Sequence, residues 1–123
     1  MAPDLLVAAG RVIFGLFFVI AGVRNFLSLP TRAPDMTNYG WVLPAPISTL
    51  GFTVQVIAGL CLVVAMQTAW ASGLLMAFLV LATALFHNPL TFPREDRALH
   101  IYLVLVNCAL FGGLLMIVGT TNG

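Results

Sequence analysis

Long apolar stretches alternate with short polar ones along this chain, and the apolar stretches determine its expected structure. Four windows contain few charged residues: 5–27, 47–66, 69–86 and 99–118. About 20 apolar residues in a helix are enough to cross the hydrocarbon core of a bilayer. The pattern therefore predicts four transmembrane helices.

The connections between these windows differ in length. The second, around Gln67, is only a few residues long, so the helices that flank it should form a tight hairpin. The first is a long linker, 28–46, whose prolines interrupt helix and whose Tyr39 and Trp41 suit a membrane interface. We expect a single domain, residues 1–123, that folds as an all-α integral membrane four-helix bundle.

Composition supports a membrane protein and excludes one class of partner. The chain is 61% hydrophobic and 7% charged, with a mean hydropathy of +1.07, whereas soluble domains are about 25% charged. Lysine is absent and the net charge is +1, so we expect no nucleic-acid partner. The expected partners are membrane lipids and either other membrane-protein subunits or further copies of this chain.

Six of the eleven Arg, Asp, Glu and His side chains lie in one stretch, FHNPLTFPREDRALH, residues 86–100. An antiparallel hairpin would return His87, which ends the third window, and His100, which begins the fourth, to the same depth. Two imidazoles with carboxylates nearby could bind a metal or haem, relay protons, line a polar pocket, or only form a solvated turn.

No CxxC or HExxH spacing supports a metal site here, so we expect none. We interpret the stretch as the rim of a polar mouth that His87, Asn88 and His100 line. Arg24 lies at the same end and should join it, whereas Arg11 should extend to the membrane interface. The charged residues of the connection should form a loop that faces water or a partner: Arg94, Glu95, Asp96 and Arg97.

Helical spacing predicts which polar side chains face the bundle interior. Thr83 shares a helical face with His87, and Asn107 shares one with His100. Gln55 lies near the middle of its window. We expect Gln55, Thr83 and Asn107 inside the bundle, either for packing alone or for contact with a ligand. Small residues that permit close helix packing accompany them: Ala8, Gly15, Gly22, Gly51 and Gly59.

The two cysteines, Cys61 and Cys108, lie in the middle of apolar windows and lack a CxxC partner. A reactive thiolate usually needs a basic neighbour or such a motif. We therefore expect two small buried hydrophobic side chains, without a disulfide between them.

Arginine is unevenly distributed between the two sides of the expected bundle. The first and third connections contain or adjoin Arg24, Arg32, Arg94 and Arg97, whereas the opposite side has only Arg11. Because positively charged loops tend to remain cytoplasmic, this pattern predicts cytoplasmic first and third connections and external termini.

Several motifs resemble the DoxX family of small bacterial membrane proteins. They are RVIFGLFFVIAGVRNF in the first window, LPAP before the second, ATALFHNP at the end of the third and NCALFGGLL in the fourth. The resemblance covers residues 11–118 and implies a four-helix bundle in the bacterial inner membrane. The better-known members of the family are membrane components of sulfur- or thiol-linked oxidoreductases that pass electrons to quinone, including thiosulfate:quinone oxidoreductase.

The chain departs from that family at two positions. Members often have a glutamate where this chain has Gln55, and a lysine where it has Val106. Without this ionisable pair, the obvious proton-handling groups are missing. We therefore expect an accessory subunit of a larger membrane redox complex, which lines a quinone or lipid site and binds no cofactor covalently. A free-standing quinone-linked oxidoreductase and a small transporter or assembly helper remain the alternatives.

Overall fold

The structure is a computed structural model that describes residues 3–30 and 36–120. Within these residues, four α-helices are each long and apolar enough to cross a membrane. The predicted all-α four-helix membrane bundle is therefore confirmed. The elements, in chain order, are α1 (Pro3–Ser28), α2 (Ala45–Val64), α3 (Thr68–Phe86), the short 3-10 helix η1 (Pro89–Thr91) and α4 (Arg94–Gly119).

Helix α4 begins earlier than the hydropathy window predicted. Its first residue is Arg94, directly after Pro93, and Glu95 and Asp96 lie in the first helical turn. The expectation of a charged loop at 94–97 is therefore wrong, because a helix can continue beyond the apolar segment that reveals it. Carboxylates in a first turn also interact favourably with the partial positive charge of a helix N-terminus.

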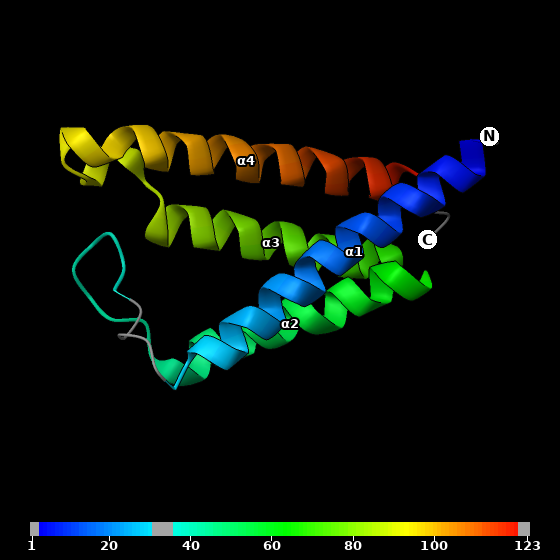
Figure 1. Cartoon of the computed structure of the whole chain (residues 1–123), viewed down its shortest axis with the longest axis horizontal. Helices are drawn as coiled ribbons and strands as arrows, with labels where there is room; N and C mark the ends of the chain where they lie inside the picture. The colour runs from blue at the N-terminus through cyan, green and yellow to red at the C-terminus, as the bar shows by residue number, and fades with distance from the viewer. Residues whose placement is uncertain (1–2, 31–35, 121–123) are drawn as a thin grey trace.

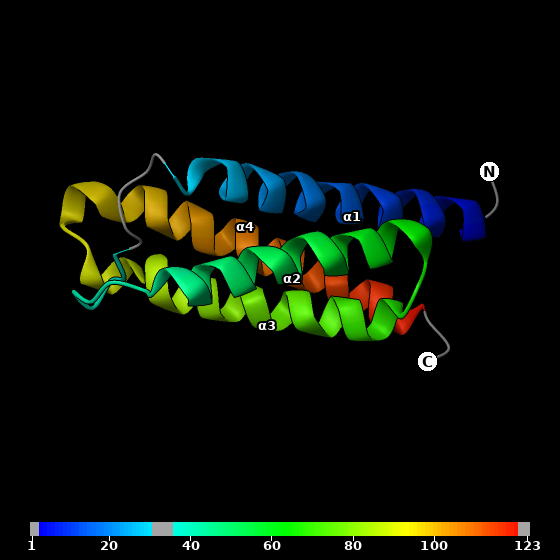
Figure 2. The same ribbon diagram turned by 90° about the horizontal axis from the view of Figure 1, so that it is seen from below.

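The helices run up and down in chain order, with both termini at the same end as the α2–α3 turn (Figures 1 and 2). Helix α1 packs along α2, α2 packs on α3, and α3 packs on α4. Helices α1 and α4 meet where the ring of Phe14 occupies the space beside Gly113. Towards the other end the α1–α2 pair and the α3–α4 pair diverge (Figure 1).

Glycine allows α1 and α2 to pack closely. A Cβ atom added to Gly15 would lie 2.6 Å from the carbonyl oxygen of Gly59, and one added to Gly59 would lie 2.8 Å from that of Gly15. A Cβ atom added to Gly22 would likewise lie close to α2, 3.1 Å from the carbonyl oxygen of Phe52. These three glycines form the α1–α2 contact, whereas Gly51 faces α3.

The apolar core fills the half of the bundle that carries the termini. It includes the fully buried side chains of Phe18, Leu62, Leu75 and Leu114. Ser72 is also buried in this half, so it lies apart from the polar groups at the other end. Close packing near the termini and divergence at the opposite end leave room for a cavity there.

The linker between α1 and α2 docks on the C-terminal end of α3. The backbone N–H of Asn38 donates to the carbonyl oxygen of Leu85 at 2.7 Å. The Asn38 side-chain amide and the Tyr39 hydroxyl both donate to the carbonyl oxygen of Ala84, at 2.9 and 3.2 Å. The last carbonyls of a helix have no partner within that helix, so the linker acts as a cap for α3.

Candidate functional site

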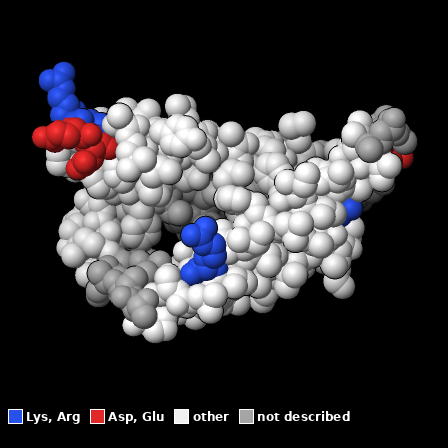
Figure 3. Space-filling view, viewed as in Figure 1, with Lys and Arg blue, Asp and Glu red and all other residues white. Residues whose placement is uncertain are grey.

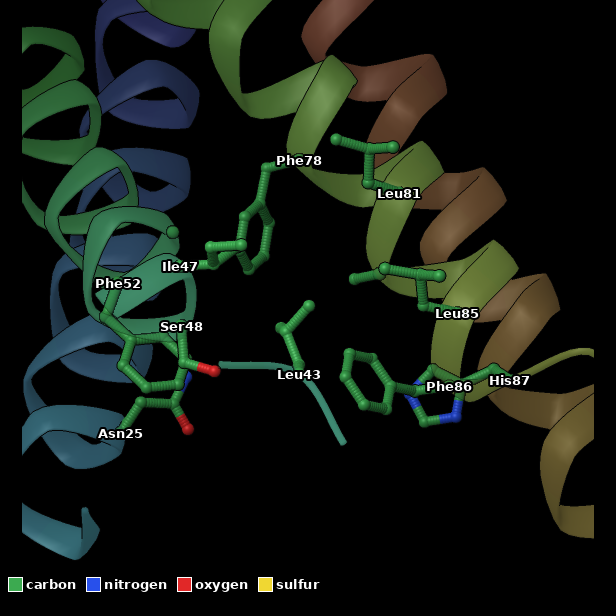
Figure 4. A pocket seen from close by; sticks show the side chains of 12 residues that line it. Asn25, Leu43, Ile47, Ser48, Phe52, Phe78, Leu81, Leu85, Phe86 and His87 are labelled. Carbon is green, nitrogen blue, oxygen red and sulfur yellow. The ribbon is translucent and has the colours of Figure 1, made fainter. Parts of the chain in front are cut away.

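A cavity of about 380 Å³ lies between α2 and α3, at the end where the helix pairs diverge. Side chains from the C-terminal half of α3 project towards the N-terminal half of α2, and Leu43 of the linker lies between the two walls (Figure 4). The main apolar lining residues are Ile47, Phe52, Phe78, Leu81, Leu85 and Phe86. The cavity can therefore accept an apolar chain or ring.

Three polar side chains also line this cavity. Asn25 and Ser48 lie together on the wall formed by α1 and α2, and His87 lies on the opposite wall (Figure 4). Among the described residues, no Asp, Glu, Arg or Lys lines it. A mainly apolar cavity with a few convergent polar groups is the usual form of a small-molecule site.

His87 is held against His100 of α4. Their Nδ1 atoms are 3.3 Å apart, which is within hydrogen-bond distance. The ring of Phe92 stacks on His100, with centroids 3.5 Å apart and ring planes 9° from parallel. The structure thus brings the two histidines together, although only His87 lines the cavity.

The environment of His87 favours its neutral form. Burial, followed by the charge of His100, lowers the pKa of His87 below its usual value of 6.5. A neutral imidazole has one nitrogen that donates a hydrogen bond and one that accepts. His87 can therefore offer either function to a ligand at neutral pH.

Asn88 supports the polar mouth without lining this cavity. Its side-chain amide donates to the Tyr39 hydroxyl at 3.4 Å, and its Oδ1 atom accepts from the backbone N–H of Leu90 at 3.1 Å. It therefore joins the linker to the connection between α3 and α4. Neither Tyr39 nor Phe92 was among the site residues predicted from sequence, because no local motif indicates these long-range contacts.

Arg24 was expected at the mouth, but its side chain is exposed and does not line the cavity. Asn25, the next residue, lines it instead. Consecutive helical residues point about 100° apart, so only one of these two side chains can face inward. The assignment of Arg24 as a lining residue of this cavity is therefore corrected to Asn25.

Charged side chains gather outside the cavity at the start of α4, where Arg94, Glu95, Asp96 and Arg97 are all exposed (Figure 3). Figure 3 also shows a hollow in the surface between α1 and α4. The charged group faces away from the apolar lining, so it is suited to contact water, lipid headgroups or another protein.

Two interhelical hydrogen bonds involve the amides that were expected inside the bundle. In the α1–α2 pair, Asn25 Nδ2 donates to Oε1 of the buried Gln55 at 3.1 Å. In the α3–α4 pair, Asn107 Nδ2 donates to Thr83 Oγ1 at 2.9 Å. Each pair of helices therefore has a hydrogen bond between polar side chains of its two helices.

Arg11 does more than extend to the membrane interface. Its guanidinium donates to the carbonyl oxygen of Leu62 at 2.8 Å. Leu62 lies in the last turn of α2, where carbonyls lack intrahelical partners and the helix dipole is negative. Arg11 therefore caps α2, and the description of a simple interfacial side chain is incomplete.

The remaining candidate groups do not converge on a reactive centre. Cys61 is partly buried and Cys108 is exposed on α4, and both are free thiols; the expectation that Cys108 is buried is therefore wrong. Within residues 3–30 and 36–120, no cluster of three or more His, Cys, Asp or Glu side chains could hold a metal ion.

Comparison with known proteins gives one match. The DoxX family matches residues 6–88 of the chain. That span includes α1 from Leu6 onwards, α2, α3 and His87, and therefore both walls of the cavity. No curated protein and no solved structure matches the chain.

Proposed function

Because this chain belongs to the DoxX family, we propose that it is an accessory integral-membrane subunit of a larger redox complex. In this role it holds a quinone or a lipid in the cavity between α2 and α3. The observation that carries the proposal is a cavity with aromatic and leucine walls and a few uncharged polar groups.

The lining matches the two parts of such a ligand. Apolar surface for an isoprenoid or acyl chain is provided by Phe52, Phe78 and Leu85. Moving such a chain out of water into apolar surroundings lowers its free energy. The side-chain amide of Asn25 and the imidazole of His87 can donate hydrogen bonds to carbonyl or ester oxygens. The lack of a charged lining residue in the described chain favours a neutral head over a phosphate, which usually binds arginine or lysine.

An accessory role is favoured over a free-standing oxidoreductase by the chemistry of the interior. Gln55 is hydrogen-bonded to Asn25, and its neutral amide is not an acid or base that could transfer protons at neutral pH. Neither Cys61 nor Cys108 has a second thiol in a CxxC motif. The chain therefore lacks an obvious group to accept electrons, and we expect a partner subunit to supply it.

The test is to identify what the cavity holds. Chain purified from its native membrane in mild detergent should retain a quinone or lipid in near-stoichiometric amount, measured by extraction and mass spectrometry. Gly51→Leu should displace it, because a Cβ atom at Gly51 already lies 3.2 Å from the Phe78 ring. The matched control is Gly10→Leu, since a Cβ atom at Gly10 meets nothing within 4 Å.

Co-purification tests the assembly half of the proposal separately. Wild-type chain should bring down a redox-active partner in native membranes, and the partner should be lost when α4 residues Arg94 and Arg97 are changed to Glu.

Equal ligand content in the Gly51→Leu and Gly10→Leu variants would refute the cavity site. A chain that purifies alone and reduces or oxidises quinone by itself would instead favour the free-standing enzyme.

A further inference from the structure

The contact between His87 and His100 can hold a limited number of protons. With the two Nδ1 atoms 3.3 Å apart, one ring must present an N–H and the other a lone pair. The His100 ring is stacked on Phe92, and the backbone of His87 is held by its N–H, which donates to the carbonyl oxygen of Thr83 at 2.9 Å. The geometry therefore ties protonation to a contact between helices.

We propose that His87 and His100 form a one-proton latch, which joins the end of α3 to α4 beside the cavity and opens when both imidazoles are protonated. The proposal concerns the protein itself and does not depend on which ligand the cavity holds. It assigns the two histidines a joint role that neither has alone.

The contact between the two imidazoles survives one added proton and breaks when a second is added. With both rings neutral, the Nδ1–H of one donates to the Nδ1 lone pair of the other. The first added proton can bind at Nε2 of the donor ring, so the bond persists and gains charge assistance. The second added proton removes the only lone pair at the contact, and two adjacent cations then repel each other.

Other ionisable groups near the latch have a smaller role. The pKa of His87 is lowered by its burial and by His100, in that order, so His100 is the charged neighbour that acts on it. On the first turns of α4, Asp96 and Arg97 are exposed to solvent. The linker contributes the Tyr39 hydroxyl, which is bonded to Ala84. Among the described residues on the opposite wall of the cavity, the polar ones are Asn25 and Ser48, and both are uncharged.

Opening the latch would change the cavity wall. His87 is the C-terminal cap residue of α3 and lines the cavity, while the connection to α4 follows directly. Loss of the His100 contact therefore frees the end of α3 on the side away from the linker. Acid at this face of the membrane would loosen one wall of the cavity while the apolar core near the termini stays packed.

The sequence permits a direct test, because the chain contains only two histidines. Full-length protein with ¹⁵N-labelled histidine, purified with a tag that lacks histidine, should show scalar coupling between the two Nδ1 nuclei near neutral pH. The coupling should survive the first protonation and disappear with the second. In His100→Gln, the pKa of His87 should rise, because the neighbouring charge is removed while burial remains.

A second measurement follows the helix end. Amide hydrogen exchange in the last turn of α3, corrected for intrinsic rates, should accelerate several-fold in acid in the wild type and much less in His100→Gln. Absence of Nδ1–Nδ1 coupling at every pH in the wild-type protein would overturn the latch. An unchanged His87 titration in a folded His100→Gln variant would do the same.

Discussion

The amide of Asn25 donates to the side-chain oxygen of Gln55 across the α1–α2 interface, at 3.1 Å. Gln55 is only 5% exposed, so this bond gives a partner to an amide oxygen that is buried between helices. Asn25 also lines the cavity. One residue therefore links helix packing to the candidate binding site.

A double-mutant cycle measures that link. Asn25→Ala and Gln55→Ala should each destabilise the bundle, and their coupling energy should be about 0.6 kcal/mol, the average for side-chain hydrogen bonds between membrane helices. Reversible unfolding in mixed micelles provides the free energies. The hydrogen-bonded pair Asn107 and Thr83 provides the matching measurement in the other helix pair. Asn25 and Thr83 are the negative control and should show no coupling energy.

The glycine contact between α1 and α2 should tolerate no side chain. Gly15→Leu places atoms where the Gly59 carbonyl already lies, so it should destabilise by about 1–3 kcal/mol as overpacked cores do. Gly112→Leu is the control, because a Cβ atom there meets nothing within 4 Å. Equal unfolding free energies for the two variants would contradict the observed packing.

The tight turn between α2 and α3 contains a strained residue. Ala65 adopts a left-handed conformation, with φ of 61°. This conformation costs an L-residue about 1–2 kcal/mol, whereas glycine adopts it without that steric cost. Ala65→Gly should therefore raise the unfolding free energy by up to about 1 kcal/mol. Ala77→Gly, at an exposed position within α3, should lower it by a similar amount.

Stability should depend on His87 in weak acid. The folded state lowers its pKa below the usual 6.5, so the unfolded chain binds more protons as pH falls below about 6.5. Stability contributed by neutral His87 is complete above that pH and is lost towards the lower pKa of the folded state. A His87→Gln variant should lack this part of the pH profile, measured by thermal unfolding at a series of pH values.

The topology can be tested with an impermeant thiol reagent. In a background with Cys61 and Cys108 replaced by Ala, single cysteines at Thr68 and Thr91 should react from opposite sides of the membrane. Arginine distribution predicts that the Thr91 side is cytoplasmic. Labelling of both cysteines from one side would exclude the four-span arrangement.

Much of the fold was predictable because a helix that crosses lipid must be mainly apolar over about 20 residues. Windows of apolar residues locate α2 and α3 to within a few residues, since their ends coincide with the ends of the apolar segments. The start of α4 was missed because Arg94–Arg97 are helical outside the apolar window, where hydropathy gives no signal. The positive charge at Arg32 lies outside the residues that the structure describes.

The candidate site was predictable only in part. Helical spacing placed Thr83 and Asn107 on facing sides of α3 and α4, and chain reversal placed His87 near His100. Helical spacing could not show whether Arg24 or Asn25 lines the cavity, because this depends on the rotation of α1 about its axis. Contacts of the linker with α3 depend on the path of an irregular segment, which no periodic pattern encodes.

The docking of Asn38 and Tyr39 on α3 has a consequence for biosynthesis. A ribosome makes the linker before it makes α3, so the groups that will complete the last turn of α3 are already present when that helix enters the membrane. The carbonyls of Ala84 and Leu85 can then find partners at once. The order of the elements along the chain thus matches the order in which the emerging helices need their caps.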